Sequence, residues 1–496
     1  MKKIKLYTVL ALSALVMSCE DAIDIQQPGL LDANAAFQSV SDLNDGLLGA
    51  YNSLDITPEM HFTSVFTDEI RIGFDNGGQG QSLYRFQLNP GNAGPSVIWT
   101  RGFQGITRAT RVIVASESLL ARNDDNDPNN DVDAAAVANI VGQAYAVRAY
   151  INLQMLSYYS PNMSDSSSLG IPIVDFVAGT DFLPTRATTG DSFDFIQADL
   201  QIAANQITAQ SSLRFFSKDA VDALRARAYA YRGQYGSAEP LASRLLAAYP
   251  LAATQDAYEA IFRDTGNAEV IMKLERTVVD TYNNQGATGS SAAGGWGGAN
   301  YAFTGPGING SPYYEVATDL ALTVEPGDRR SAVIYEFFPN FSQAGRDVYT
   351  VNKYRGSEGQ PLMNDHKIFR SSEMLLILAE AAAANNNTQR VTDLIDDLRD
   401  SRYGADVADK VVSNQTQAYG LILDERRLEF AFEGHRYNDL RRLGALGNRS
   451  IDRAAEDCAS FGACDLPISD FRFTWPIPQA EFNGNPGLRA QQNPGY

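Results

Sequence analysis

The sequence predicts a mostly α-helical protein, built from stacked helical hairpins with long irregular loops inserted between them. Three observations support this prediction. Apolar residues return at helical spacing along most of the chain, helical segments follow one another in pairs, and two stretches rich in glycine and aromatic residues lack any helical period. The 496 residues are ample for a large core.

The N-terminal residues 1–18 have the pattern of a secretory signal peptide. A basic start precedes an apolar run that is too short to span a membrane stably, and a small residue precedes Cys19. The letters V-M-S-C resemble a bacterial lipobox, which would make Cys19 the acylated first residue of the mature protein. Residues 19–40 show no period and are predicted to form the lipidated N-terminus and its tether.

Residues 41–496 are predicted to form a single domain, with helices at about 41–54, 99–160, 191–250 and 371–443. Near residue 240, one pair of helices has the spacing of a tetratricopeptide (TPR) repeat. Its small, aromatic, small and proline positions are Ala226, Tyr229, Ala238 and Pro250. Small residues let two antiparallel helices approach closely, so TPR-like hairpins are expected to stack along the chain.

Two inserts, at about 62–98 and 281–323, separate these helices. They are rich in glycine, asparagine, glutamine and aromatic residues, which is typical of long loops. A sugar ring has an apolar C–H face and a polar rim, so an aromatic plane with surrounding polar side chains suits it. The candidate ligand-binding residues are therefore Trp296, Tyr301, Tyr313 and Tyr314, together with Phe74, Asn76, Tyr84 and Arg85. Alternatively, these aromatic side chains pin the loops to the helices.

Residues 424–444 read as one charged helix, because Leu428, Phe432 and Leu440 recur at helical spacing and Gly444 supplies a stop. We expect its acidic and basic side chains to hold the last helices against the chain's C-terminal tail. Two cysteines in this region, Cys458 and Cys464, lie six residues apart in a chain that the signal peptide sends out of the cytoplasm. A disulfide is favoured over two free thiols.

The pattern E-R-R-x-E-x-x-F-E-G-x-R-x-x-D-L-R-R-L-G in this stretch, followed by P-I-P and N-P-G-Y in the tail, resembles the C-terminal signature of the SusD/RagB family. G-A-Y at 49–51 and G-Q-A-Y-A-V-R-A-Y at 142–150 resemble further motifs of that family. Its members are surface lipoproteins of Bacteroidetes that capture nutrients, mostly glycans.

This resemblance implies a SusD-like fold, a glycan ligand and delivery to a SusC-like, TonB-dependent transporter in the outer membrane. It also implies a location at the cell surface, anchored in the outer membrane through lipid on Cys19. Two alternatives stay open: the same fold binding peptides, as in RagB-like uptake proteins, or an interaction scaffold without a small ligand.

No catalytic motif accompanies the resemblance. The three histidines form no H-E-x-x-H pattern, and the sequence has neither a phosphate-binding P-loop nor a G-x-S-x-G elbow, so no enzyme is predicted. The net charge of −19 disfavours nucleic acid as a partner.

No cofactor is expected, although one acidic segment has the ligand spacing of a calcium loop. Its oxygen ligands would be Asp125, Asp127, Asn129, Asp131 and Asp133. Ala136 occupies the position that needs a bidentate glutamate, so a solvated loop is favoured and no metal site is predicted.

Overall fold

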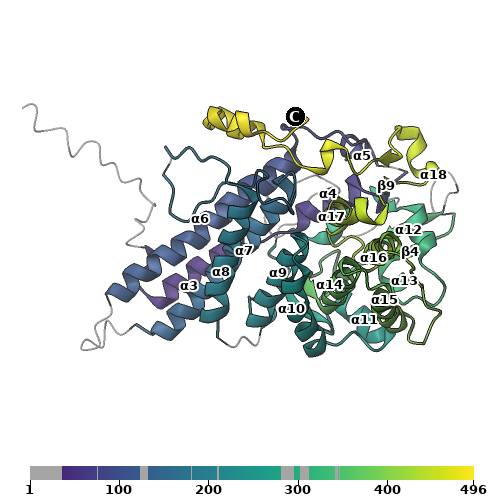
Figure 1. The fold of residues 1–496 in the computed structure, drawn as a ribbon, viewed down its shortest axis with the longest axis horizontal. Coiled ribbons are helices and arrows are strands. Elements are labelled where there is room, and N and C mark those ends of the chain that lie inside the picture. The colour runs from purple at the N-terminus through teal and green to yellow at the C-terminus, as the bar shows by residue number, and fades with distance from the viewer. Residues whose placement is uncertain are drawn as a thin grey trace, which may run out of the picture.

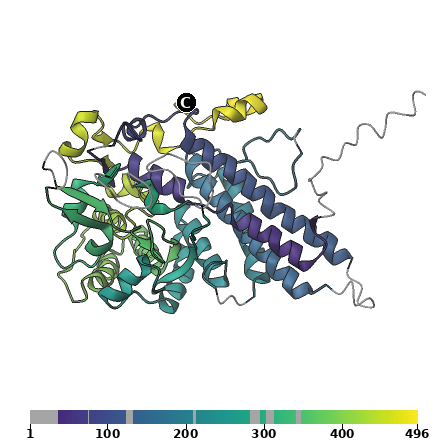
Figure 2. The ribbon, with the colours of Figure 1, turned by 180° about the vertical axis from the view of Figure 1, so that it is seen from behind.

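The structure is a computed structural model that describes residues 36–74, 76–122, 132–179, 181–208, 212–280, 295–301, 312–340, 345 and 347–496. It confirms the mostly α-helical prediction. Figures 1 and 2 show an elongated molecule with long helices at one end and a cluster of shorter helices at the other. The C-terminal tail runs across the top of both views.

The long helices are α3 (Val40–Tyr51), α6 (Ala93–Ala121), α7 (Ala134–Tyr159) and α8 (Thr189–Gln206). α7 is the central one, and its sequence is apolar on nearly every side because α3, α6 and α8 all pack against it. Its one buried arginine, Arg148, donates two hydrogen bonds of 2.8 Å to Asp199 of α8. The pairing offsets the cost of burying both charges.

The shorter helices form the predicted hairpins, α9 (Lys218–Tyr231) with α10 (Tyr235–Ala248), α14 (Ser371–Ala384) with α15 (Thr388–Tyr403), and α16 (Gln415–Glu429) with α17 (Arg436–Gly447). Ala226 and Ala238, the small residues of the TPR pattern, are fully buried, as a close approach of α9 and α10 requires. The remaining helices are α4 (Thr57–Phe66), α5 (Gln81–Tyr84), α11 (Gln255–Phe262), α12 (Thr318–Thr323), α13 (Ser331–Ile334), α18 (Ala455–Cys458), α19 (Gln479–Gly484) and the 3-10 turns η1 (Gly297–Asn300), η2 (Ala459–Phe461), η3 (Phe471–Phe473) and η4 (Pro486–Gln491).

Each described strand belongs to a two-stranded antiparallel ladder. The pairs are β1 (Ile70–Ile72) with β3 (Tyr314–Val316), β2 (Val270–Leu274) with β8 (His366–Arg370), β4 (Tyr335–Phe338) with β5 (Val348–Val351), β6 (Gly356–Ser357) with β7 (Gln360–Pro361), and β9 (Ile451–Asp452) with β10 (Asp465–Leu466). In the first ladder Arg71 stands opposite Glu315 and donates to it over 2.8 Å. This ladder brings the two inserts together.

The stretch 424–444 is two helices rather than the single one predicted. α16 ends at Glu429, α17 begins at Arg436, and the chain turns between them at Phe432 and Gly434, whose φ angles are 66° and 85°. Positive φ breaks a helix, and for phenylalanine it is a strained conformation that its surroundings must hold. α17 also continues past Gly444 to Gly447, and Asn448 ends it with a φ of 49°.

A network of buried charges lies between these hairpins and β8. Arg402 of α15 donates to Glu269 over 2.8 Å and to Glu429 over 2.8 Å, and Arg370 donates to Glu429 over 2.6 Å and to Glu433 over 2.8 Å. Burial alone would raise the pKa of Glu429, but Arg402 and Arg370 lower it well below its ordinary value. Glu429 therefore stays ionised inside the protein.

The partners of the charged stretch differ from those expected. Its side chains reach β8 and α15 in the buried network, and Asp68 at the end of α4, rather than the C-terminal tail. Tyr437 does reach the region before the tail, because its hydroxyl donates to the carbonyl of Arg472 over 2.9 Å and its ring stacks on Phe473. The stretch thus joins segments that lie far apart in the sequence.

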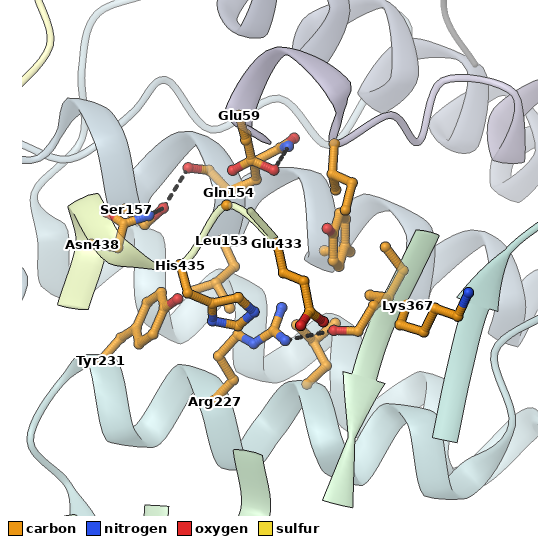
Figure 3. Close-up of a pocket in the computed structure, with 15 residues that line it drawn as sticks. Glu59, Leu153, Gln154, Ser157, Arg227, Tyr231, Lys367, Glu433, His435 and Asn438 are labelled. Carbon is orange, nitrogen blue, oxygen red and sulfur yellow. Dashed lines mark hydrogen bonds between the residues drawn. The ribbon is translucent and has the colours of Figure 1, made fainter. Parts of the chain in front are cut away.

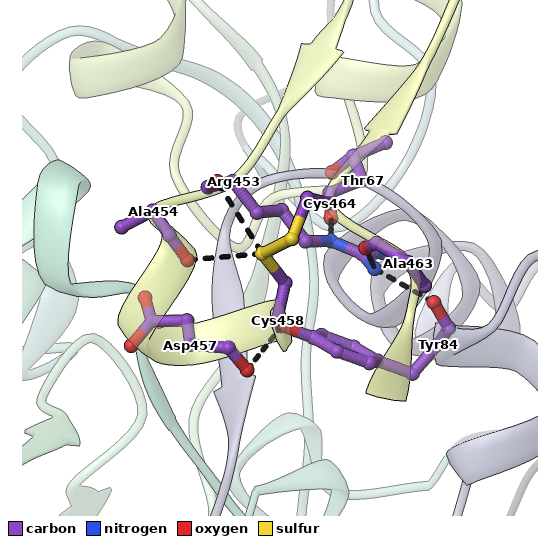
Figure 4. The surroundings of a disulfide bond; sticks show 8 residues. All are labelled: Thr67, Tyr84, Arg453, Ala454, Asp457, Cys458, Ala463 and Cys464. Atoms are coloured by element: carbon purple, nitrogen blue, oxygen red, sulfur yellow. Dashed lines mark hydrogen bonds between the residues drawn. A yellow bond between two sulfur atoms is a disulfide. The ribbon is translucent and has the colours of Figure 1, made fainter. Parts of the chain in front are cut away.

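Cys458 and Cys464 form the predicted disulfide, with their Cα atoms 5.0 Å apart. Figure 4 shows that this small loop surrounds Arg453, whose guanidinium donates to the carbonyls of Thr67, Tyr84 and Ala463. The disulfide thereby braces the residue that ties α5 and the end of α4 to the C-terminal part of the chain.

Replacing Glu433 with alanine should destabilise the protein strongly. The change leaves Arg370 and Lys353 buried without this carboxylate, each of which bonds it over 2.8 Å, so the free energy of unfolding should fall by about 3–5 kcal/mol. Chemical denaturation measures the loss, and ligand affinity of the folded fraction should stay unchanged.

The matched control for this change is Asp424→Ala. Asp424 pairs with Arg449, but their side chains are 43% and 40% exposed, so its loss should cost at most about 1 kcal/mol. Equal losses from both variants would contradict the role assigned to the buried network.

Candidate functional site

Helix α4 positions the candidate site, and the C-terminal part of the chain holds it in place. Arg436 of α17 donates two hydrogen bonds, of 2.9 and 2.8 Å, to Asp68, which lies just beyond the end of α4. Burial alone would raise the pKa of Asp68, but Arg427 and Arg436 bring it down to about 2. Arg453 donates to the last carbonyls of α4, at Val65 and Phe66, over 3.1 and 2.9 Å. These bonds satisfy backbone groups that the helix end leaves open.

Next to α4 lies a cleft of about 210 Å³, which we call the α4–α5 cleft. One wall comes from a single face of α4, where Pro58, His61 and Phe62 follow one another at helical spacing. The opposite wall comes from α5 and the residues around it. These residues include Gly78, Gly80, Gln81, Ser82, Leu83, Leu88, Asn92 and Pro95. The lining therefore combines apolar surfaces with neutral polar groups.

The loop before α5 approaches the second insert closely at Gly80. This residue has a φ of 65°, and a Cβ atom there would collide with the hydroxyl of Tyr314. The hydroxyl of Tyr314 in turn lies 3.4 Å from the Nε2 atom of His61, so the second insert packs behind the wall of the cleft that α4 provides. Because Gly80 has no side chain, the backbone of the cleft wall can pack directly against the buried pair of His61 and Tyr314.

The structure corrects the predicted aromatic platform, because four of its aromatic residues lie in the interior. Trp296 is 6% exposed and Tyr301 is 4% exposed, while Tyr314 and Tyr84 are fully buried. The Tyr301 hydroxyl lies 3.0 Å from Ser64 Oγ, and its ring stacks on Tyr354. Side chains packed in this way have no free face for a sugar ring. They fit the alternative that the sequence left open, in which aromatic residues pin the inserts to the helices.

The other predicted residues divide into two kinds. Asn76 is buried and donates to the carbonyl of Tyr313 over 2.9 Å, so both residues serve the contact between the inserts. Phe74 is 47% exposed and Arg85 is also exposed, with its guanidinium 5.5 Å from the ring centre of Phe461. Only Phe74 and Arg85 of the eight predicted residues are exposed, and neither of them lines the cleft.

Sequence reasoning missed the residues that do line the cleft. Gly78 and Gly80 belong to the glycine-rich run G-G-Q-G of the first insert. The conformational freedom of these glycines and the turn-forming sequence N-P-G-N at 89–92 indicate a loop that can fold over a ligand. This was the sequence signal that could have located the cleft. His61, Phe62 and Pro58 gave no such signal, because only the packing of α4 places that buried face along the cleft.

A second, smaller pocket of about 50 Å³ lies on another side of α4 (Figure 3). Glu59 points into it and accepts a hydrogen bond of 2.7 Å from Gln154. Burial raises the pKa of Glu59 to about 7. Burial, with the nearby Arg227, lowers the pKa of His435 well below its ordinary value. The pocket has room for water rather than for a sugar ring.

Two earlier expectations fall outside the described residues. Cys19 precedes them, and most of the acidic calcium-like segment lies in 123–131. Asp133 is described, and its carboxylate accepts from the backbone of Ala135 and Ala136, which caps the start of α7. Within the described ranges, no group of three or more His, Cys, Asp or Glu side chains is arranged to hold a metal. No helix there is long and apolar enough to cross a membrane.

Two sequence families match the chain. Residues 347–496 match the SusD family, and residues 26–230 match the family described as starch-binding, associating with the outer membrane. Two SusD-like proteins of Formosa agariphila are 23% and 21% identical to the chain, and each alignment covers the whole of both sequences.

Solved structures share the fold. A SusD superfamily protein from Bacteroides vulgatus superposes with a TM-score of 0.75 at 22% identity, covering 93% of this chain and all of that one. A SusD-like carbohydrate-binding protein from the same species has a TM-score of 0.70 at 17% identity, covering 92% of this chain and 98% of that one.

Glu69 provides a pH-dependent test of how α4 is anchored. Burial raises the pKa of Glu69 to about 7 from an ordinary value of 4.5, although Ser64 Oγ and the amide of Phe432 both donate to it. Between these pH values the folded protein keeps a proton that the unfolded chain loses, so stability from this group falls as pH rises.

Replacing Glu69 with glutamine should remove this loss. The variant should gain stability over the wild type as pH rises from 4.5 to 7, reaching about 3 kcal/mol by pH 8. Denaturation curves at several pH values measure the difference. Glu239→Gln on the exposed surface of α10 should show no such trend, and a flat difference for Glu69→Gln would refute the assignment.

Proposed function

Because the chain belongs to the SusD family, we propose that it is a surface glycan-binding protein that captures oligosaccharide or polysaccharide without converting it. The α4–α5 cleft is the structural feature that best supports this proposal. It opens between α4 and the glycine-rich part of the first insert, and buried charge pairs such as Arg436 with Asp68 hold α4 in place.

The chemistry of the cleft suits a neutral sugar. Leu83, Leu88 and Pro95 offer apolar contact to the C–H face of a ring, whereas Gln81, Ser82 and Asn92 offer donors and acceptors to its hydroxyl groups. A volume of about 210 Å³ has room for roughly one ring, so a longer glycan would extend beyond the cleft over the surrounding loops. Exposed Phe74 is a candidate contact for such an extension.

The lining also suits binding rather than cleavage. Hydrolysis of a glycosidic bond needs two carboxyl groups across the sugar, and the described lining of the α4–α5 cleft includes no aspartate or glutamate. Its polar side chains are amides, a hydroxyl and an imidazole. They can orient a glycan through hydrogen bonds.

The proposal extends to anchoring and delivery. Lipid on Cys19 would hold the protein on the outer membrane, and a SusC-like, TonB-dependent transporter would take up the captured glycan. Support comes from the lipobox-like sequence and from the family descriptions, one of which names association with the outer membrane.

Filling the cleft should abolish capture. A screen of plant, algal and host glycans first identifies a ligand, and isothermal titration then compares variants. Ser82 is exposed in α5 and lines the cleft, so Ser82→Trp should weaken binding at least roughly tenfold by occupying the space of the ring. Ser82→Thr, which keeps the hydroxyl group and adds only one methyl group, should bind within about threefold of the wild type.

A second comparison separates the cleft from the aromatic platform predicted at first. Trp296→Ala removes a buried ring of the predicted platform and should leave the affinity of the folded protein unchanged. Loss of binding in folded Trp296→Ala, together with normal binding in Ser82→Trp, would place the ligand elsewhere and overturn the proposed cleft.

The anchoring step is tested separately. Cys19→Ser removes the thiol that would be acylated, so the variant should move from the membrane fraction to the soluble fraction of cells and lose co-purification with a TonB-dependent transporter. Ser13→Ala, in the same segment, serves as the control and should fractionate like the wild type. Membrane retention of Cys19→Ser would disprove the lipid anchor.

A further inference from the structure

A second large cleft, of about 220 Å³, lies away from the α4–α5 cleft and belongs to no part of the function proposed above. It opens between the loop after α7, the turn joining α9 to α10, and helix α17, and we call it the α7–α17 cleft. It adjoins the small pocket of Figure 3, since Ser157, Tyr231 and Asn438 line both. The face of α4 that carries Glu59 looks toward this side, whereas Pro58, His61 and Phe62 look toward the first cleft.

Aromatic side chains from three helices line the α7–α17 cleft. Tyr231 comes from α9, Tyr235 from α10 and Tyr419 from α16. Tyr231 and Tyr235 are partly exposed, in contrast to the buried rings of the inserts. Met163 and Leu446 extend the apolar surface, and Leu446 is 47% exposed at the rim. This is the combination of aromatic and apolar surface that contacts the C–H face of a sugar.

The cleft carries positive charge in a chain whose net charge is −19. Its charged lining residues are Arg441 and Arg442, and no described carboxylate lines it. Arg442 is neutralised by Glu380 and Asp439, at 2.6 and 2.8 Å. Arg441 instead donates to the carbonyls of Ser157 and Ser160 at the end of α7, and it pairs with no carboxylate in the described part of the chain.

The loop that forms the outer rim is held in place. Arg232 of the α9–α10 turn donates to the carbonyl of Met163 over 2.6 Å and to Ser166 Oγ over 2.8 Å. Asn162 accepts from the backbone and hydroxyl of Ser164. The cleft is thus preformed, which lowers the entropic cost of binding.

We propose that the α7–α17 cleft is a second saccharide site, which binds one acidic sugar residue. The anionic group would lie toward Arg441, the ring against Tyr231 and Tyr235, and the hydroxyl groups near the amide of Asn438. A volume below the roughly 300 Å³ of typical drug-sized sites fits one ring rather than several. This site does not depend on the α4–α5 cleft, so either can exist without the other.

The test compares a galacturonic acid trisaccharide with the neutral galactose trisaccharide, by isothermal titration on the purified full-length protein. The acidic trisaccharide should bind at least roughly tenfold more tightly and should lose affinity with rising salt, because Coulomb attraction to Arg441 is screened. Leu446→Glu places an acid at the exposed rim and should weaken its binding at least tenfold. Leu446→Gln, of the same size but uncharged, should change it by less than about threefold.

Two further variants show whether the acidic sugar binds in the α7–α17 cleft. Ser164→Glu, in the exposed loop on the opposite rim, should weaken binding as Leu446→Glu does, and it replaces that variant if Leu446→Glu fails to fold. Ser82→Trp, which fills the first cleft, should leave acidic binding intact. Equal affinity for both trisaccharides, no binding, loss of acidic binding in Ser82→Trp alone, or displacement by inorganic sulfate at the same concentration would each overturn the proposal.

Discussion

Charges buried in the interior of a protein must be paired, and this constraint organises the C-terminal half of the molecule. Glu429 lies where α15, α16 and β8 meet, and it is fully buried between Arg370 and Arg402. Removing one member of such a group leaves the others desolvated without compensation. The hairpins α14–α15 and α16–α17 are therefore tied to one arrangement by charge pairing as well as by apolar packing.

The same constraint reaches the candidate site. The turn between α16 and α17 forces Phe432 into a strained backbone conformation, and the amide of that residue donates to Glu69 beyond α4. Arg436, at the start of α17, pairs with Asp68 next to it. Strain at the turn is thus offset by contacts that fix α4, and α4 supplies one wall of the α4–α5 cleft. Residues of the C-terminal signature thus fix α4 in place, and none of them lines the described part of the α4–α5 cleft.

Helix α4 also separates two sites of different character. On one face, the α4–α5 cleft presents neutral amides, a hydroxyl and an imidazole. On the other side, beyond the small pocket that holds Glu59, the α7–α17 cleft presents tyrosine rings and Arg441, which pairs with no carboxylate among the residues that the structure describes. A protein with two such sites could hold a polysaccharide at one neutral and one acidic residue, so that weak contacts at each site add to a firmer hold on the chain.

Much of the fold was determined by the sequence alone, because it depends on interactions between near neighbours. Helical periodicity predicted the hairpins, the small residues Ala226 and Ala238 predicted the close approach of α9 and α10, and the six-residue spacing of Cys458 and Cys464 predicted their disulfide. Tertiary structure alone decided the rest. Aromatic side chains such as Trp296 and Tyr301 are favoured both in a protein core and in stacking on a sugar ring. The composition of the insert therefore did not reveal that these two residues are buried. The break at Phe432, whose amide donates to Glu69, and the partners of Glu429, which lie 27 and 59 residues before it, depend on tertiary contacts that periodicity within one segment does not report.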